Sequence, residues 1–178
     1  MQELPDDEIA ISQGERLLVR PVRREDEAAV VEMMAMASPE DVRFRCFGAI
    51  KDFPHMMAAQ LVKIDPARET TLVAESTAEH GRIMGIVHMI DERTEPGVAE
   101  YDIMVRPDHK GHGLGYRLMQ EILSEARRKG LRAVEGYILC DNDAMLRMAE
   151  ELGFKKVSLT GDMVRMRHEV QARPVSEN

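Results

Sequence analysis

The feature that most constrains the fold is a glycine-rich segment, residues 105–115, that joins a strand pattern to a helix pattern. The segment reads VRPDHKGHGLG, and glycine occupies every second position from residue 111 onward. Side-chain alternation over 98–105 predicts a strand before the loop, and apolar spacing over 114–129 predicts an amphipathic helix after it. Glycines leave the loop backbone uncovered and the helix begins with unpaired N–H groups, so the segment predicts a site for phosphate or pyrophosphate.

The spacing of this loop differs from that of two other nucleotide-binding motifs. A Walker A loop ends in Gly-Lys-Ser/Thr, whereas Lys110 precedes the glycines. A dinucleotide fingerprint requires G-x-G-x-x-G after the first strand of a βαβ unit. Lys110, Arg117 and a protonated His112 could add positive charge to the site. The remaining alternative is a glycine-rich turn that binds no ligand.

The periodicity of the whole chain predicts a single α/β domain with a mixed sheet, rather than a doubly wound parallel one. Strands are expected at 16–22, 71–76, 83–91, 98–105, 134–139, 155–159 and 162–167. Helices are expected from residues 25 and 39 onward and at 54–63, 114–129 and 142–152. We expect the domain to span residues 15–170, with flexible tails at 1–14 and 171–178.

The composition limits the classes of partner. The formal net charge of −8 argues against a nucleic-acid binder, because such proteins present a basic face to phosphates. A negative field suits a cationic substrate such as an amine, although it also favours mere solubility. No apolar run approaches the ~20 residues of a membrane span, and the acidic N-terminus is unlike a signal peptide. Cys46 and Cys140 form no CxxC pair and the histidines lack ligand-like spacing, so we expect a cytoplasmic protein without a metal site.

Two segments together carry a family resemblance. The run V-x-P-x-x-K-G-x-G-x-G at 105–115 resembles the signature of the GNAT superfamily, and residues 142–145 and 151–154 resemble its N-x-x-[AM] … L-G-F segment. The resemblance implies the GNAT fold, an α/β (α+β) fold whose mixed, mostly antiparallel sheet has about six to seven strands flanked by helices. It also implies acetyl-CoA as the acetyl donor. The implied cofactor-binding residues are Ile103, Met104, Val105, Lys110, Gly111, His112, Gly113, Leu114, Gly115, Tyr116, Arg117 and Asn142.

A wider resemblance covers roughly residues 16–167. LLVRPVRREDE, SPEDVRFRCFG, KIDPARETTLVA and VAEYDIMVRPD are similar to the acetyltransferase domain of bacterial protein-lysine acetyltransferases, which modify acyl-CoA synthetases and related proteins. The resemblance implies that the acceptor is a lysine on another protein, such as an acyl-CoA synthetase. Two alternatives stay open: a small amine acceptor (polyamine, amino acid or aminoglycoside), and a CoA-sensing module that has lost catalysis. The oligomeric state stays open as well.

Two carboxylates on the strand 98–105 supply the candidate general base. Glu100, Asp102 and Met104 share one face of that strand because side chains alternate. An amine must lose a proton to attack a thioester, and like-charge repulsion with partial burial would raise one carboxyl pKa toward a useful range. The alternative is that the two acids mark a solvated face. In the resembling enzymes the glutamate of the A-E-[FY] segment is the base, which implies this role for Glu100.

The proton donor to the departing thiolate is less evident. Many superfamily members carry a Tyr about four residues before the final Gly-Phe for this purpose, and this chain has Ala149 there. Water can serve, since a thiol of pKa ~8.5 leaves readily. Tyr101 and Tyr137 are possible donors, although core or rim positions are the simpler prediction for both. Cys140 as an acetyl carrier and His88 as a functional residue are disfavoured alternatives.

Overall fold

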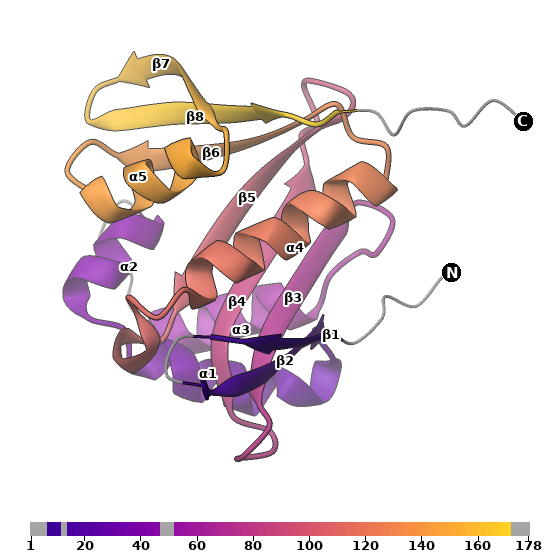
Figure 1. Cartoon of the computed structure of the whole chain (residues 1–178), viewed down its shortest axis with the longest axis vertical. Helices are drawn as coiled ribbons and strands as arrows, with labels where there is room; N and C mark the ends of the chain where they lie inside the picture. The colour runs from indigo at the N-terminus through magenta and orange to yellow at the C-terminus, as the bar shows by residue number, and fades with distance from the viewer. Residues whose placement is uncertain (1–6, 12–13, 47–51, 172–178) are drawn as a thin grey trace, which may run out of the picture.

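The computed structural model describes residues 7–11, 14–46 and 52–171, which form an eight-stranded sheet with helices on both faces (Figure 1). The strands are β1 (Asp7–Ala10), β2 (Arg16–Pro21), β3 (Glu69–Ser76), β4 (Ile83–Asp91), β5 (Val98–Val105), β6 (Ala133–Leu139), β7 (Lys155–Thr160) and β8 (Met163–Glu169). The α-helices are α1 (Glu27–Ala35), α2 (Pro39–Cys46), α3 (Phe53–Val62), α4 (Leu114–Arg128) and α5 (Asp143–Glu151).

The strand order is β1-β2-β3-β4-β5-β6-β8-β7. Every neighbouring pair is antiparallel except β5 and β6, which are parallel. The predicted mixed α/β architecture is therefore confirmed, with eight strands in place of the six to seven expected. β4 and β5 begin and end at the predicted residues, and the other predicted strands and helices are present with small shifts at their ends.

The extra strand is β1, which lies inside the segment expected to be a flexible tail. That expectation is wrong for residues 7–10, which pair with residues 16–19 of β2. Ile9 and Ile11 are buried in the same apolar cluster as the inner face of α4. Tertiary pairing and burial hold this short strand in place despite its acidic neighbours. Residues 1–6 and 172–178 of the expected tails lie outside the described residues.

Two apolar layers cover the sheet, one on each face. Figure 1 shows α4 crossing in front of the strands, with α1 and α3 behind them. α4 buries one side, including Leu118, Ile122 and Ala126, as its amphipathic spacing predicts. On the other face, α1 and α3 enclose a second cluster in which Met33 and Met57 are buried against β3 and β4 side chains. These layers pack against both faces of β3, β4 and β5 beneath the site.

The sheet opens between β5 and β6. These parallel strands pair only over residues 98–100 with 133–135. Beyond this point β5 remains paired with β4 and β6 remains paired with β8, so the two strands diverge, as Figure 1 shows. The backbone groups on the facing edges of the strands are thereby released from the ladder. The candidate site lies where the strands separate.

Candidate active site

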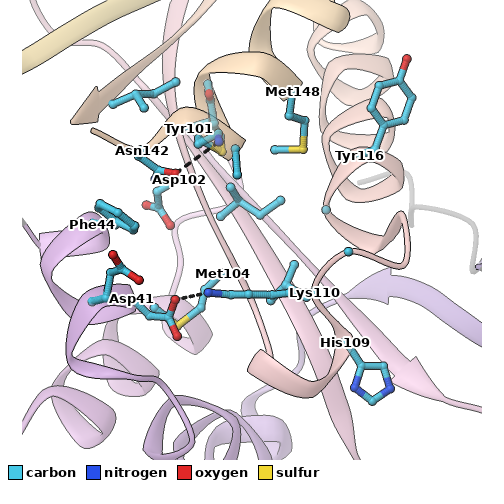
Figure 2. Close-up of a pocket in the computed structure, with 18 of the residues that line it drawn as sticks. Asp41, Phe44, Tyr101, Asp102, Met104, His109, Lys110, Tyr116, Asn142 and Met148 are labelled. Atoms are coloured by element: carbon cyan, nitrogen blue, oxygen red, sulfur yellow. Dashed lines mark hydrogen bonds and ion pairs between the residues drawn. The ribbon is translucent and has the colours of Figure 1, made fainter. Parts of the chain in front are cut away.

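A cavity of about 600 Å³ opens between the separated strands. Its walls are β5, β6, α2, α5 and the loop before α4 (Figure 2). Most of the lining surface is apolar. The carboxylates that line it are Glu40, Asp41, Glu100, Asp102 and Glu151. A mostly apolar cavity with a few placed charged groups is the usual form of a small-molecule site.

The glycine loop presents open backbone to this cavity. Gly111 and Gly113 have φ values of +75° and +89°. A residue with a side chain would be strained in this backbone conformation. A Cβ placed on either glycine would meet no described atom within 4 Å, so the loop surface is open. Gly113 is the N-cap of α4 and provides no side-chain cap, which leaves the N–H groups of the first turn to other partners. With the positive end of the helix dipole, they form a site for an anion.

Arg106 fixes the direction in which this loop leaves β5. Its guanidinium is buried and donates hydrogen bonds of 3.0 and 2.6 Å to the Asp108 carboxylate. These bonds hold the pKa of Asp108 well below its usual range. The Arg106 backbone N–H also donates to the Met84 carbonyl of β4 at 2.8 Å. The loop is thus anchored to the sheet before the glycines begin.

Most of the predicted cofactor-binding residues line the cavity. They are Ile103, Met104, Val105, Lys110, Gly111, Gly113, Gly115, Tyr116 and Asn142. His112, Leu114 and Arg117 are not among the lining residues. Leu114 is fully buried in the core, and the Arg117 guanidinium contacts Gln120 and Glu121 along α4. Any contact of these three residues with a ligand would therefore involve the backbone or a rearranged side chain.

Lys110 points toward α2 rather than along the glycine loop. Figure 2 shows its side chain crossing the cavity to form an ion pair with Asp41. Asp41 is only 7% exposed and also forms a reciprocal cap with Ser38. Burial opposes ionisation of Asp41, but hydrogen bonds from Lys110 and Ser38 outweigh it and lower the pKa of the carboxyl. Lys110 therefore links the glycine loop to α2.

The presence of α2 at the site is not evident from the sequence. Residues 41 and 110 are 69 positions apart in the sequence. Only the Ser-Pro-Glu-Asp helix start indicates that the side chain of Asp41 is held in place. Arg43 of α2 adds an ion pair of 2.9 Å to Asp141, which precedes α5. Other lining residues that the sequence did not indicate are Phe44, Ile138 and Met148. They come together only because β5 and β6 diverge.

The two carboxylates of β5 have different surroundings. Glu100 is exposed at the cavity, at the last residue pair that joins β5 to β6. Asp102 lies 3.4 Å (Oδ2) from Nδ1 of His88, and Nε2 of that ring lies 3.1 Å from Oε2 of Glu69. Burial lowers the pKa of His88, but Asp102 and then Glu69 outweigh it and raise the pKa. His88 thus lies between two carboxylates, and both favour the protonated form of its ring.

Tyr101 lies at the narrow end of the gap between the strands. It is 5% exposed, lines the cavity, and packs edge-on against Phe154 with ring centroids 5.4 Å apart. Its ring lies over Gly136 of β6, where a Cβ would collide with it. Burial raises the pKa of its phenol far above the ordinary value. Ala149, at the position of the superfamily's usual tyrosine, is fully buried.

Cys140 is an exposed free thiol just beyond β6. Across residues 7–11, 14–46 and 52–171, no cluster of three or more His, Cys, Asp or Glu side chains is placed to hold a metal ion. Within the same ranges, every helix is too short or too polar to cross a membrane.

Known proteins resemble this chain in sequence. The acetyltransferase (GNAT) family matches residues 32–154. Acetyltransferase PA5475 of Pseudomonas aeruginosa is 29% identical over 146 residues, which cover 82% of this chain and 78% of that protein. The L-methionine sulfoximine/L-methionine sulfone acetyltransferase of Salmonella typhimurium is 34% identical over 79 residues. That second match covers 43% of this chain and 46% of the relative, about half of its length.

Solved structures share the fold. The GNAT domain of S. lividans PAT superposes with a TM-score of 0.84 at 21% identity, over 94% of this chain and 99% of that one. Spermidine N-acetyltransferase from Vibrio cholerae, solved with CoA and spermine, has a TM-score of 0.69 at 19% identity, over 86% and 95% of the two chains. These likenesses confirm the GNAT fold, and the family match covers more than half of the sequence. The chain therefore belongs to the GNAT family and is an acetyl-CoA-dependent N-acetyltransferase.

Proposed function

We propose that this enzyme transfers acetyl directly from acetyl-CoA to a lysine side chain of another protein, with Glu100 as the general base. The position of Glu100 carries the proposal. Its carboxylate is exposed at the cavity, where β5 and β6 separate. A lysine on a folded protein can enter the cavity only as far as its own side chain reaches. The general base of the enzyme must therefore be accessible from outside the cavity. The resemblance of residues 16–167 to protein-lysine acetyltransferase domains supports the same acceptor.

The charge of the cavity favours a cationic acceptor. Glu40 and Glu100 are exposed lining residues, and Asp102 lies two positions along the same strand. A negative field concentrates ammonium groups near the site. The same field favours the protonated amine, so a base at the site must take its proton before or during attack. Glu100 is well placed for this, directly or through a water molecule.

The proposed reaction takes place with both substrates bound. The pyrophosphate of acetyl-CoA contacts the open N–H groups of the glycine loop, and the thioester lies along β5 near Met104. The amine nitrogen attacks the carbonyl carbon, its proton passes to Glu100, and the C–S bond then breaks with its electron pair on sulfur. A backbone N–H of β5 stabilises the oxygen as it becomes negative.

The substitution Glu100→Gln tests the base. It preserves size and polarity but cannot accept the proton, so we expect turnover to fall by roughly 10²–10⁴-fold. Acetyl-CoA affinity, measured by calorimetry, should stay close to that of the wild type because the glycine loop is untouched. Glu32→Gln, on the exposed surface of α1, is the matched control and should retain full turnover. Wild-type turnover in the E100Q enzyme would exclude Glu100 as the base.

A second acceptor class is a small amine. It is favoured by the acidic cavity and by relatives that are named for spermidine and methionine sulfoximine. Incubation of the enzyme with isotopically labelled acetyl-CoA and cell lysate, followed by mass spectrometry, separates the two. We expect label on protein lysines, in a pattern lost with E100Q. Label confined to small metabolites would contradict the protein-lysine proposal and support the small-amine one.

A further inference from the structure

We propose that Arg165 and Arg167 are positioning residues for the proposed base, Glu100. They bind the neighbouring carboxylate of Glu135 and prevent the two acids from sharing a proton, which keeps Glu100 able to accept one from the amine. The inference rests on the function proposed above for the role of Glu100. It deepens that function because it assigns the strength of the base to a group of charges on β6 and β8.

Glu100 and Glu135 are neighbours where β5 meets β6. They form the last of the three residue pairs that join these parallel strands. Paired residues on adjacent strands point to the same face of a sheet, and such strands lie about 4.8 Å apart. The next residue on each strand points to the opposite face, where Tyr101 lies against Gly136 and α4 packs. The two carboxylates therefore share the face on which Glu100 lines the cavity.

Two carboxylates in this arrangement ordinarily disturb each other. Like charges directly opposite on adjacent strands are unfavourable, and two carboxylates that share a site commonly hold one proton between them. Glu135 is only 5% exposed, and burial by itself opposes its ionisation. A proton held between the two acids would block Glu100, because a general base must begin the reaction deprotonated.

Two arginines of β8 occupy both carboxylate oxygens of Glu135. Arg165 donates from Nε to Oε2 at 2.7 Å and from Nη2 to Oε1 at 2.6 Å. Arg167 donates from Nη1 to Oε1 at 2.7 Å. Burial raises the pKa of Glu135, but the hydrogen bonds from Arg165 and then Arg167 outweigh it and lower the pKa. Glu135 therefore keeps its negative charge and does not compete for the proton that Glu100 accepts.

The register of the sheet places these charges in line. Glu135 is paired with Arg167 across β6 and β8, and Arg167 is paired with Lys155 of β7. One row across four strands thus contains Glu100, Glu135, Arg167 and Lys155, in that order. Glu95, before β5, holds Arg167 from another side at 3.0 Å. The arginines lie one strand beyond Glu135, so they act on Glu100 through the carboxylate between them.

Other charged groups also surround Glu100. They lie on β3, β4, β5, α2 and the glycine loop, and they are Glu69, His88, Asp102, Glu40, Asp41 and Lys110. Asp102 contacts His88, and Lys110 pairs with Asp41. These groups stay the same when residues of β6 and β8 are changed. Differences between such variants therefore report on Glu135 and its arginines.

The sign of the charge separates this role from a purely structural one. An ion cluster that only held β6 to β8 would be weakened by the removal of either partner, so both substitutions would act in the same direction. The effect on Glu100 instead reverses with the sign of the charge that is removed. The test therefore compares variants that remove opposite charges from the same cluster.

The test follows the pKa of Glu100 by NMR titration of its labelled carboxyl carbon, assigned by comparison with E100Q. Arg165→Gln removes a positive charge from Glu135, so the pKa of Glu100 should rise by about 1 pH unit. Glu135→Gln removes the adjacent negative charge and should lower it by roughly the same amount. The double variant E135Q/R165Q restores the balance and should return to within about 0.3 pH unit of the wild type.

Turnover provides a second readout. The acidic limb of the pH profile of kcat/KM for the acceptor should move to higher pH in R165Q and to lower pH in E135Q. Arg128→Gln is the matched control, because Arg128 pairs with Glu125 on α4, across the sheet from Glu100. It should leave the pKa of Glu100 within about 0.2 pH unit of the wild type, since the lost charge is distant and screened.

A pKa of Glu100 that is unchanged in both single variants, or that moves in the same direction in both, would overturn the inference. The NMR spectra also show whether each variant is folded. The titration needs no acceptor, so its failure is distinguishable from failure of the proposed function, which full turnover of E100Q would reveal.

Discussion

At the scale of single residues, His88 is the group whose role differs most from its appearance in the sequence. It reads as an isolated histidine within a strand, yet the fold places it between Asp102 and Glu69, on the strands to either side. Its pKa is raised because both carboxylates favour the protonated ring. The contact with His88 therefore holds the Asp102 side chain in place, and Asp102 lines the cavity two residues from Glu100.

The protonation of His88 should make stability depend on pH. A raised folded-state pKa stabilises the fold fully below the unfolded value of ~6.5, and this contribution is lost as pH rises through the higher folded value. We expect His88→Gln to destabilise the protein by about 1–3 kcal/mol at pH 6, where hydrogen bonds from the imidazolium are lost. The deficit should shrink as the pH is raised toward 9.

Urea denaturation at several pH values measures this difference. His55→Gln serves as the control, since His55 is an exposed histidine that also contacts one aspartate. Its effect should be small at every pH. A deficit in H88Q that stays constant from pH 6 to 9 would show that the imidazolium contributes nothing to the fold.

At the scale of elements, α2 depends on ion pairs as much as on apolar packing. Its Asp41 is tied to Lys110 of the glycine loop, and its Arg43 is tied to Asp141 before α5. The Arg43–Asp141 pair is exposed and contributes little. The Lys110–Asp41 pair involves a buried carboxylate, so loss of the lysine leaves that charge without its partner.

We expect Lys110→Met to loosen α2 selectively. The uncompensated charge of Asp41 should lower the free energy of unfolding by about 1–2 kcal/mol, less than for a fully buried pair because Lys110 is half exposed. Amide hydrogen exchange in α2 should rise in the variant, while exchange in α4 and β4 stays slow. Arg43→Met, with an exposed partner, is the matched comparison and should change exchange in α2 much less. Equal protection of α2 in K110M and the wild type would contradict this coupling.

The elements that the sequence predicts well are those whose pattern is local. β4 and β5 match the predicted bounds because alternation and flanking turns define them, and α4 matches because its apolar stripe faces the sheet. β1 escaped prediction because its stability comes from pairing with β2, not from its four acidic and apolar residues. The glycine loop and Glu100 were visible as motifs. The contribution of α2 was not, because it arises from contacts between distant segments.

At the scale of the whole molecule, charge and architecture act together. The net charge of −8 gives the enzyme a negative field, against which the N-terminal end of α4 offers local positive potential. The two substrates therefore meet opposite electrostatics: a cationic acceptor is attracted by the field as a whole, and an anionic donor depends on the local dipole and N–H groups.

We expect salt to affect the two substrates differently. Raising the ionic strength from about 0.05 to 0.5 M shortens the Debye length several-fold and should reduce kcat/KM for a lysine-containing peptide by roughly 3–10-fold. The kcat/KM for acetyl-CoA should not fall in parallel, because its contacts are short-range. Steady-state kinetics with each substrate varied in turn, in potassium chloride, measures both. A peptide response that is flat or rises with salt would contradict acidic steering of the acceptor.

The three residue pairs that join β5 to β6 have a mechanical consequence for the enzyme. Through the backbone ladder, they connect one part of the sheet, β1 to β5, to a second part made of β6, β8 and β7. Three residue pairs resist relative movement of these two parts of the sheet less than a full-length ladder would. A molecule in the opening lies against the free edges of both parts.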